Sequence, residues 1–343
     1  MIKASIVGAT GYVGMELLRL LKNHPQVEIA HLASHGNAEE KISDIYPSLK
    51  GICDIKLETV DPAKIADSDV VFTALPYATG AETISKLYSL GCAVIDMSAD
   101  FRYISPEVYK QWYAVEHPHP ELLAHSVYGL PELHREKIKN SRLIGNPGCY
   151  TTCSILALAP LVKSGLIDLN TIIIDAKSGT SGAGRKPDAA LYFCEVNDSF
   201  KAYGVTTHRH TSEIEQELSL LANRNIVLSF TPHLLPINRG ILATSYAVLN
   251  TTDVNAIKDA YDNFYADEPF VQVSHGLLPE LKHVVGSNYC KIGYAVDKRL
   301  GRIVIVSVID NLIKGAAGQA IQNMNIKFGI DEKCGLDMPA WYI

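Results

Sequence analysis

The chain has 343 residues, of which 47% are hydrophobic and 20% charged, so we expect a globular protein with two domains. This composition excludes a disordered, a collagen-like or a disulfide-stapled chain. The formal net charge of −6 is a diffuse acidic balance, which favours neither a nucleic-acid nor a membrane partner.

The sequence shows no export or membrane signal. The N-terminus is a strand-like run followed by a glycine loop, and no window approaches the roughly 18 uninterrupted apolar residues of a membrane helix. The seven cysteines are scattered and form no CxxC pair, so we expect reduced thiols and no metal site. These features together predict a cytoplasmic protein.

The first hundred residues alternate strand and helix patterns. Strands are predicted over residues 2–7, 27–33, 69–75 and 93–97, with Pro76 ending the third, and helices over residues 14–23 and 79–90. The first helix carries Leu17, Leu18 and Leu21 on one face. Strands separated by helices of this length predict βαβ units and a parallel sheet.

The second half has a different pattern. Strand-like runs cover residues 171–176, 226–232, 240–249 and 302–309 with few helices between them, which predicts a largely antiparallel sheet. A last long helix is predicted over residues 312–327. The expected fold class is therefore α/β plus α+β, a Rossmann-like parallel-sheet domain followed by a mostly antiparallel α+β domain.

A glycine-rich loop follows the first strand and opens the first helix. It reads Gly8-Ala9-Thr10-Gly11-Tyr12-Val13-Gly14. Glycines at this spacing close the turn and let backbone N–H groups approach a pyrophosphate at the helix N-terminus. The loop therefore predicts a bound dinucleotide.

The end of the second strand favours NADP(H) over NAD. An NAD site usually has an acidic residue there for the ribose 2′-hydroxyl, whereas this strand runs into Ser34 and His35. Ser34 can hydrogen-bond a 2′-phosphate, and His35 or Lys41 can lie near its charge. Glu39 and Glu40 follow closely, so NAD stays the alternative.

Cys149 is the candidate nucleophile. A short strand runs into the sharp turn Asn146-Pro147-Gly148, and Cys149 then opens an apolar helical run. The positive end of a helix lowers the pKa of a thiol at its N-terminus, and the thiolate is the reactive form. The alternative is a buried packing cysteine, which is our interpretation of Cys153 one turn further on.

Two further segments contain side chains suited to catalysis or anion binding. The loop from Ser178 and Gly179 to Gly184 presents backbone donors, with Arg185 and Lys186 beside it. His208 and His210 precede a helical stretch, and histidine transfers protons near neutral pH. A mobile surface loop and two surface histidines are the alternatives.

These segments together resemble the N-acetyl-γ-glutamyl-phosphate reductase family. Beside the glycine loop, the resemblance rests on residues 98–102, 145–152, 208–214, 236–240 and 310–319, and it covers essentially the whole chain. The family is itself similar to aspartate-semialdehyde dehydrogenase in fold and mechanism. The resemblance implies a Rossmann-like NADP domain at residues 1–148 with the C-terminal part 312–343 packed onto it, and a catalytic and oligomerisation domain at residues 149–311.

The resemblance also implies residue roles. Cys149 matches the nucleophile and His210 the acid/base histidine, with His208 as the second candidate because the two are too close in sequence to separate. Substrate-binding residues are expected at Arg102, Asn146, Arg185 and Arg239. Cofactor-binding residues are expected at Gly8, Thr10, Gly11, Tyr12, Val13, Gly14, Ser34, His35, Pro76, Ser178, Gly179 and Asn311.

The implied reaction is the NADPH-dependent reduction of N-acetylglutamyl 5-phosphate through a cysteine thioester, in arginine biosynthesis. The expected partner is a small acyl phosphate, and the resemblance implies a homo-oligomer, a tetramer or a dimer. The first alternative is the same chemistry on a carrier-bound aminoadipyl phosphate of lysine biosynthesis. Aspartate-semialdehyde dehydrogenase itself and a non-catalytic NADP-sensing regulator are the others.

Overall fold

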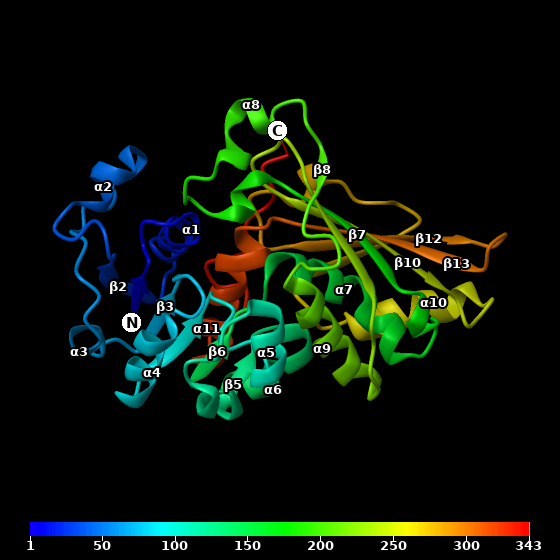
Figure 1. Ribbon diagram of the computed structural model, residues 1–343, viewed down its shortest axis with the longest axis horizontal. Helices are drawn as coiled ribbons and strands as arrows, with labels where there is room; N and C mark the ends of the chain where they lie inside the picture. The colour runs from blue at the N-terminus through cyan, green and yellow to red at the C-terminus, as the bar shows by residue number, and fades with distance from the viewer. Residues whose placement is uncertain (343) are drawn as a thin grey trace. The chain divides into compact units, whose positions relative to one another are not determined.

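The computed structural model describes residues 1–342, and the chain forms two compact units (Figure 1). The first unit comprises Met1–Pro147 and Ala316–Leu336, and the second comprises Gly148–Gly315 and the residues from Asp337 onward. The tail therefore differs from the sequence expectation, which assigned residues up to 343 to the first domain. Hydrogen bonds explain the difference, because Trp341 N donates to Val285 O (2.9 Å) and Tyr289 Oη to Asp337 Oδ1 (2.6 Å).

The first unit is built on a six-stranded parallel sheet. Its strand order is β2-β1-β3-β4-β6-β5, and every neighbouring pair is parallel. The predicted strands are confirmed, whereas β5 was not predicted because three residues are too short to show a pattern. The strands are β1 (Ile2–Val7), β2 (Val27–Ala33), β3 (Val70–Thr73), β4 (Ala93–Asp96), β5 (Ser126–Tyr128) and β6 (Leu143–Gly145).

Helices of the first unit bury apolar faces. The predicted face of α1 (Tyr12–Leu21) is confirmed, since Leu17, Leu18 and Leu21 are all buried. The other α-helices are α2 (Ile42–Ile45), α3 (Pro62–Ile65), α4 (Ala81–Ser89), α5 (Pro106–Tyr113), α6 (Pro131–Asn140) and α11 (Gly318–Lys327), with 3₁₀ turns at Pro47–Leu49 and Pro120–His125.

The second unit contains a seven-stranded mixed sheet of order β11-β12-β13-β10-β7-β9-β8. The pairs β7–β9 and β11–β12 are parallel and the remaining pairs are antiparallel, so the predicted mostly antiparallel sheet is confirmed. Strands β11 and β12 were not predicted. The strands are β7 (Ile173–Ser178), β8 (Lys201–Ala202), β9 (Ser229–Leu234), β10 (Ile241–Val248), β11 (Val271–His275), β12 (Cys290–Asp297) and β13 (Arg302–Ile309).

Three longer helices accompany this sheet. Helix α7 (Cys149–Lys163) packs against β10, β13 and α9 (His210–Ala222). It is buried almost throughout, apolar in its second half and with the hydroxyl side chains of Thr151, Thr152 and Ser154 buried near its start. Helix α10 (Val254–Phe264) was missed by the sequence analysis. Shorter segments are α8 (Phe193–Val196), a π-helix at Ile313–Ala317, and 3₁₀ turns at Leu169–Thr171, Thr180–Ala183, Ala189–Leu191 and Leu281–His283.

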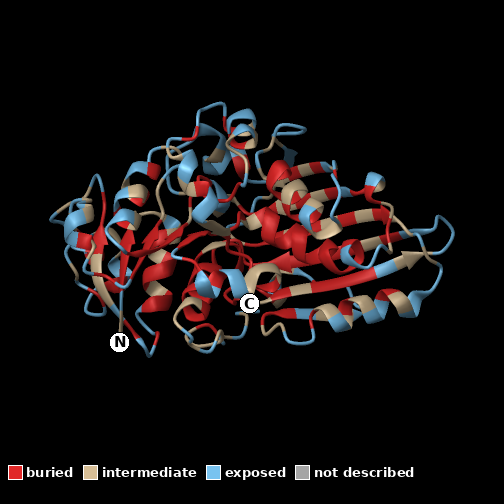
Figure 2. Cartoon of the chain, turned by 90° about the horizontal axis from the view of Figure 1, so that it is seen from below, coloured by how far each residue is buried: buried red, intermediate tan, exposed pale blue. Residues whose placement is uncertain are grey.

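Burial follows the alternation of the chain. Along β10 the residues alternate between buried and partly exposed, so one face of this strand lies in the core. Figure 2 shows buried residues along the strands and inner helices, and exposed residues on outer helices and loops. No helix among residues 1–342 is long and apolar enough to cross a membrane.

Candidate active site

The glycine loop between β1 and α1 is shaped by two of its three glycines. Gly8 has a φ of +89°, and an added Cβ would lie 2.9 Å from Ala74 C and still closer to Ala74 O. A Cβ on Gly14 would lie 2.7 Å from Ala9 Cα, below the 3.0 Å that real Cβ contacts respect. A Cβ on Gly11 would meet nothing closer than 3.6 Å. Packing therefore requires glycine at positions 8 and 14 but leaves Gly11 unexplained.

Gly11 caps the N-terminus of α1. The first N–H groups of a helix have no partner within it, so the amides of Tyr12 and Val13 point out of this end. The first turn of α1 contains no acidic side chain, which leaves the positive end of the helix uncompensated. Because Gly11 has no side chain, an anion can approach the backbone at this helix N-terminus. The geometry of the loop therefore fits a dinucleotide pyrophosphate.

The neighbouring strand ends contribute the other predicted cofactor residues of this unit. Thr10 Oγ1 and Ser34 Oγ are 3.2 Å apart, so the glycine loop is tied to the loop after β2. Ser34 is buried, whereas His35 and Pro76 are exposed. Because β1, β2 and β3 are adjacent parallel strands, their carboxyl ends meet at one edge of the sheet.

Asp100 supports this edge and was not predicted by itself. Its buried carboxylate accepts hydrogen bonds from Ala78 N (2.9 and 3.0 Å) and Tyr109 Oη (2.7 Å). Ala78 has a φ of +62°, so Asp100 holds a strained backbone position two residues after Pro76. Burial, and then the charge of Asp100, raise the pKa of Asp96 to about 6. The only sequence signal for Asp100 was its place in the segment 98–102.

Arg102 and Asn146 lie inside the first unit. Arg102 is 8% exposed, and it donates from Nε to Asn146 O (2.7 Å) and from Nη2 to Met97 O (3.1 Å). Asn146 Nδ2 donates to Ala316 O (3.1 Å), and Asn146 Oδ1 accepts from Asn323 Nδ2 (3.0 Å). The contacts of both side chains support the backbone segment that leads into Pro147.

Cys149 begins α7 in the second unit. Gly148 is the N-cap, and its N–H donates to Glu213 Oε1 (2.8 Å). Thr151 Oγ1 donates to the same oxygen (2.8 Å), so the fully buried Glu213 on α9 holds the turn before the cysteine. Cys149 itself is partly exposed. The arrangement places a reachable thiol at the positive end of a 15-residue helix.

The two histidines have different surroundings. The ring of His210 lies against Gly148, beside Cys149, because a Cβ on Gly148 would lie 2.8 Å from His210 Cε1. His208 Nδ1 instead accepts a hydrogen bond from His210 N (3.2 Å), and its ring packs between Tyr150, Tyr203 and Phe230. Burial, and then the nearby Arg209 charge, lower the pKa of His208 to about 4, so this imidazole is neutral at pH 7.

Cys153 is a packing residue, as expected from the sequence. It is fully buried, and its Sγ lies 3.2 Å from Ser307 Oγ. Burial raises the pKa of this thiol to about 12, which removes the reactive thiolate at neutral pH.

The loops after β7 and β9 are joined to each other. Gly179 N donates to Gly240 O (3.0 Å), and a Cβ on Gly179 would lie 2.7 Å from Asn238 O. Asn311 connects the same two loops, since its Oδ1 accepts from Gly240 N (2.7 Å) and its Nδ2 donates to Ser181 Oγ (3.0 Å). Ser178, at the end of β7, is buried and donates to Gly179 O (2.9 Å).

The two predicted arginines of this unit differ in exposure. Arg239 pairs with the buried Asp310, at 3.0 Å from Nη2 to Oδ1, and its guanidinium lies 5.5 Å from the Trp341 ring. Asp310 also accepts from Gly286 N (2.8 Å) and Leu312 N (2.8 Å), so it organises this region. Arg185 is exposed in the loop after β7.

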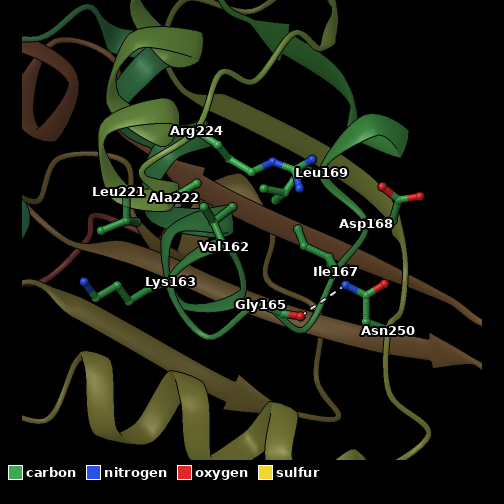
Figure 3. A pocket seen from close by; sticks show the side chains of 10 residues that line it. All are labelled: Val162, Lys163, Gly165, Ile167, Asp168, Leu169, Leu221, Ala222, Arg224 and Asn250. Carbon is green, nitrogen blue, oxygen red and sulfur yellow. Dashed lines mark hydrogen bonds between the residues drawn. The ribbon is translucent and has the colours of Figure 1, made fainter.

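A hollow of about 400 Å³ lies elsewhere in the second unit (Figure 3). It is formed at the C-terminal ends of α7 and α9, and its charged side chains are Lys163, Asp168 and Arg224. None of the predicted site residues lines it, so it is separate from the candidate site. Residues 1–342 contain no cluster of three or more His, Cys, Asp or Glu side chains that could hold a metal ion.

Comparison with known proteins gives matches over the whole chain. The model described as semialdehyde dehydrogenase, NAD binding domain, matches residues 3–141, and that described as semialdehyde dehydrogenase, dimerisation domain, matches residues 149–311. A protein of Acetivibrio thermocellus named N-acetyl-gamma-glutamyl-phosphate reductase is 56% identical, with 100% of both chains covered. The chain belongs to the N-acetyl-γ-glutamyl-phosphate reductase family.

A second relative and two solved structures also match the chain over nearly its whole length. A reductase of the same name from Caldicellulosiruptor bescii is 53% identical over 100% of both chains. An aspartate semialdehyde dehydrogenase structure from Vibrio cholerae has a TM-score of 0.74 at 16% identity, covering 96% of this chain and 98% of its own. One from Candida albicans, solved with NADP, has a TM-score of 0.70 at 18% identity, with 95% and 98% covered. At these identities the structures show the fold alone, which is the two-domain semialdehyde dehydrogenase fold expected from the sequence.

Proposed function

We propose that the chain catalyses the NADPH-dependent reduction of N-acetyl-L-glutamyl 5-phosphate to N-acetyl-L-glutamate 5-semialdehyde and phosphate, in arginine biosynthesis. The observation that carries this proposal is the 56% identity, over the full length of both chains, to a reductase of that name. Such full-length relatives favour the acetylated glutamyl substrate over a carrier-bound aminoadipyl substrate.

NADP(H) fits the residues of the first unit. The helix N-terminus behind Gly11 suits a pyrophosphate, and the second strand ends without a carboxylate at Ser34 and His35. Ser34 and His35 would hold the 2′-phosphate, while residues 8–14 and Pro76 would line the rest of the site. In the second unit, Ser178, Gly179 and Asn311 would approach the nicotinamide. When bound, this cofactor supplies the hydride.

Cys149 is the proposed nucleophile. Its thiolate attacks the acyl carbon, phosphate leaves with the bonding electron pair, and a thioester remains on Sγ. Hydride addition converts the thioester to a thiohemiacetal, whose collapse releases the aldehyde and regenerates the thiolate. The backbone N–H groups of Cys149 and Tyr150 at the start of α7 would stabilise the oxyanion.

His210 is the proposed proton-transfer residue, and His208 supports it. The ring of His210 lies against the turn that carries Cys149. His208 accepts from the backbone of His210 and stays neutral, which suits a residue that fixes the start of α9. Proton transfer at the thiohemiacetal oxygen would then use His210.

The remaining predicted residues are assigned to the substrate. Arg185 and Arg239 would bind its carboxylate or phosphate, Arg239 from its position beside Asp310. Arg102 and Asn146 would contribute indirectly, because their contacts support the segment before the nucleophile.

We infer a cytoplasmic homo-oligomer, a dimer or a tetramer. Support comes from the match of residues 149–311 to a domain described as a dimerisation domain. Light scattering on the purified protein is expected to give two or four times the mass of 37.5 kDa, and a monomer at micromolar concentration would contradict this inference.

The reverse reaction tests the proposed function. N-acetyl-glutamate 5-semialdehyde, NADP and phosphate are supplied, and the absorbance of the reduced cofactor is followed with and without phosphate. We expect phosphate-dependent turnover that is lost in Cys149→Ala while NADP binding persists, because only the thioester step needs the thiol. Cys153→Ala is the matched control and should retain turnover. Equal turnover of aspartate semialdehyde, or activity in Cys149→Ala, would contradict the proposal.

A further inference from the structure

Gly148 lies between two side chains of α9. Its N–H donates to Glu213 Oε1 (2.8 Å). On its other side, an added Cβ would lie 2.8 Å from His210 Cε1, 2.9 Å from His210 Cδ2 and still closer to His210 Nε2. The imidazole therefore occupies the space in which every other amino acid would place its side chain.

The backbone itself does not require glycine here. Gly148 has φ −69° and ψ 154°, an extended conformation that any L-residue adopts. The neighbouring ring therefore requires glycine here, whereas at Gly8 a positive φ adds conformational strain to the crowding. The three atoms nearest to such a Cβ all belong to the ring of His210.

The ring cannot retreat freely. His210 is the first residue of α9, and its N–H is held by His208 Nδ1 (3.2 Å). One turn later Glu213 binds both Gly148 N and Thr151 Oγ1, which fixes α9 against the start of α7. The Tyr150 ring lies 6.0 Å from the His210 ring in an edge contact.

We propose that Gly148 is a positioning residue, whose missing side chain allows His210 to lie against the turn that carries Cys149. The inference rests on the proposed function, in which Cys149 and His210 act together. Proton transfer requires the two groups within hydrogen-bond reach, and displacement by about 1 Å lowers rates on the order of 100-fold. A methyl group at position 148 would displace the ring on this scale.

A double-mutant cycle tests the proposal with wild type, Gly148→Ala, His210→Ala and Gly148→Ala/His210→Ala. The readouts are kcat for the semialdehyde reaction, the pH profile of Cys149 alkylation by iodoacetamide, and Tm. We expect Gly148→Ala to lower kcat on the order of 100-fold and to change the alkylation profile towards that of His210→Ala. In the His210→Ala background the second substitution should change kcat by less than about twofold, because no ring remains to be displaced.

Gly293→Ala is the matched control. Gly293 lies on β12 in the same unit, and a Cβ there would be as crowded, at 2.9 Å from Pro279 Cδ. This variant should lower Tm and leave the alkylation profile unchanged. Equal effects of Gly148→Ala in both backgrounds, or an unchanged alkylation profile, would overturn the proposal.

Poor folding of Gly148→Ala is also informative. If the clash is with His210, removal of the ring in the double variant restores Tm, whereas an equally low Tm in the double variant contradicts the proposal. The Cys149→Ala result is independent of this cycle. Loss of turnover in Cys149→Ala together with additive effects in the cycle would leave the proposed function intact and remove only the role of Gly148.

Discussion

At the scale of single residues, chemically similar side chains a few positions apart lie in different surroundings. Cys149 is partly exposed at a helix N-terminus, whereas Cys153 is buried beside Ser307 with a pKa raised to about 12. His210 lies against Gly148, whereas His208 is enclosed by aromatic rings with a lowered pKa. Burial thus distinguishes the two cysteines, whereas the two histidines, both partly exposed, differ in the side chains that surround them.

His208 makes the protein less stable in mild acid. Its folded pKa of about 4 is below the ordinary 6.5, so between these values the unfolded chain binds a proton that the folded chain does not. Stability therefore decreases as the pH falls from 6.5 towards 4. His208→Asn keeps an acceptor for His210 N but cannot titrate in this range.

The measurement is the free energy of unfolding in urea at pH 7 and pH 5. Wild type should lose roughly 1–2 kcal/mol more than His208→Asn between these two pH values. The other histidines titrate alike in both proteins, so the difference isolates His208. Equal losses in the two proteins would show that this imidazole is not held neutral by burial.

At the scale of elements, the loop between β1 and α1 contains one glycine that the fold needs, Gly8, and one that only a bound ligand would need, Gly11. Gly8→Ala places a Cβ against Ala74 at a φ of +89°, so the variant should lose at least about 1–2 kcal/mol of stability. Gly11→Ala meets no atom within 3.5 Å, so its stability should change little, while a methyl group there blocks the approach of a pyrophosphate.

Thermal unfolding and NADP titration measure the two effects. Gly11→Ala should bind NADP at least about tenfold more weakly, which corresponds to about 1.4 kcal/mol, with a Tm near that of wild type. If Gly11→Ala bound NADP normally, the amides at the start of α1 would not contact the pyrophosphate.

At the scale of the whole molecule, the first unit is made of two stretches of the chain that are far apart in the sequence. Helix α11 belongs to the first unit although it follows residues 148–315 in the sequence, which form the second unit. Its residues Ala320, Ile321 and Met324 are buried. Asn323 on this helix donates to Gly129 O (2.8 Å) and Asn146 Oδ1 (3.0 Å). Such contacts between distant parts of the chain carry a high loop-closure cost and form slowly.

Asn323→Ala tests how much these hydrogen bonds contribute to the free energy of unfolding. The substitution leaves the buried Asn146 side chain and Gly129 O without a donor, and we expect a loss of about 2–3 kcal/mol in the free energy of unfolding. Lys327→Ala on the same helix should cost less than about 0.5 kcal/mol. Equal small effects of both substitutions, measured by urea unfolding, would show that water replaces the lost hydrogen bonds.

Sequence alone determined the features that depend on neighbouring residues. The strand and helix periods predicted β1 to β4, α1 and the long strands of the second unit. The glycine spacing at positions 8, 11 and 14 and the place of Cys149 after a sharp turn gave the candidate residues of each unit. Strands β5 and β11 were missed because three to five residues show little periodicity and depend on pairing with neighbouring strands. Helix α10 was overlooked although its sequence does show a helical pattern, with buried Ile257 and Tyr261 four positions apart and Asp253 as the N-cap.

Only the tertiary structure decided what depends on contacts between distant residues. Arg102, expected at the substrate, is buried on the backbone of Asn146, 44 positions away. Glu213 lies 65 positions from the glycine that it holds, and Asp100 lies 22 from Ala78. The proposal of His210 rather than His208 rests on the ring of His210 lying against Gly148. Spacing in the sequence does not encode these distances, because burial and hydrogen-bond partners are set when the folded chain brings remote segments together.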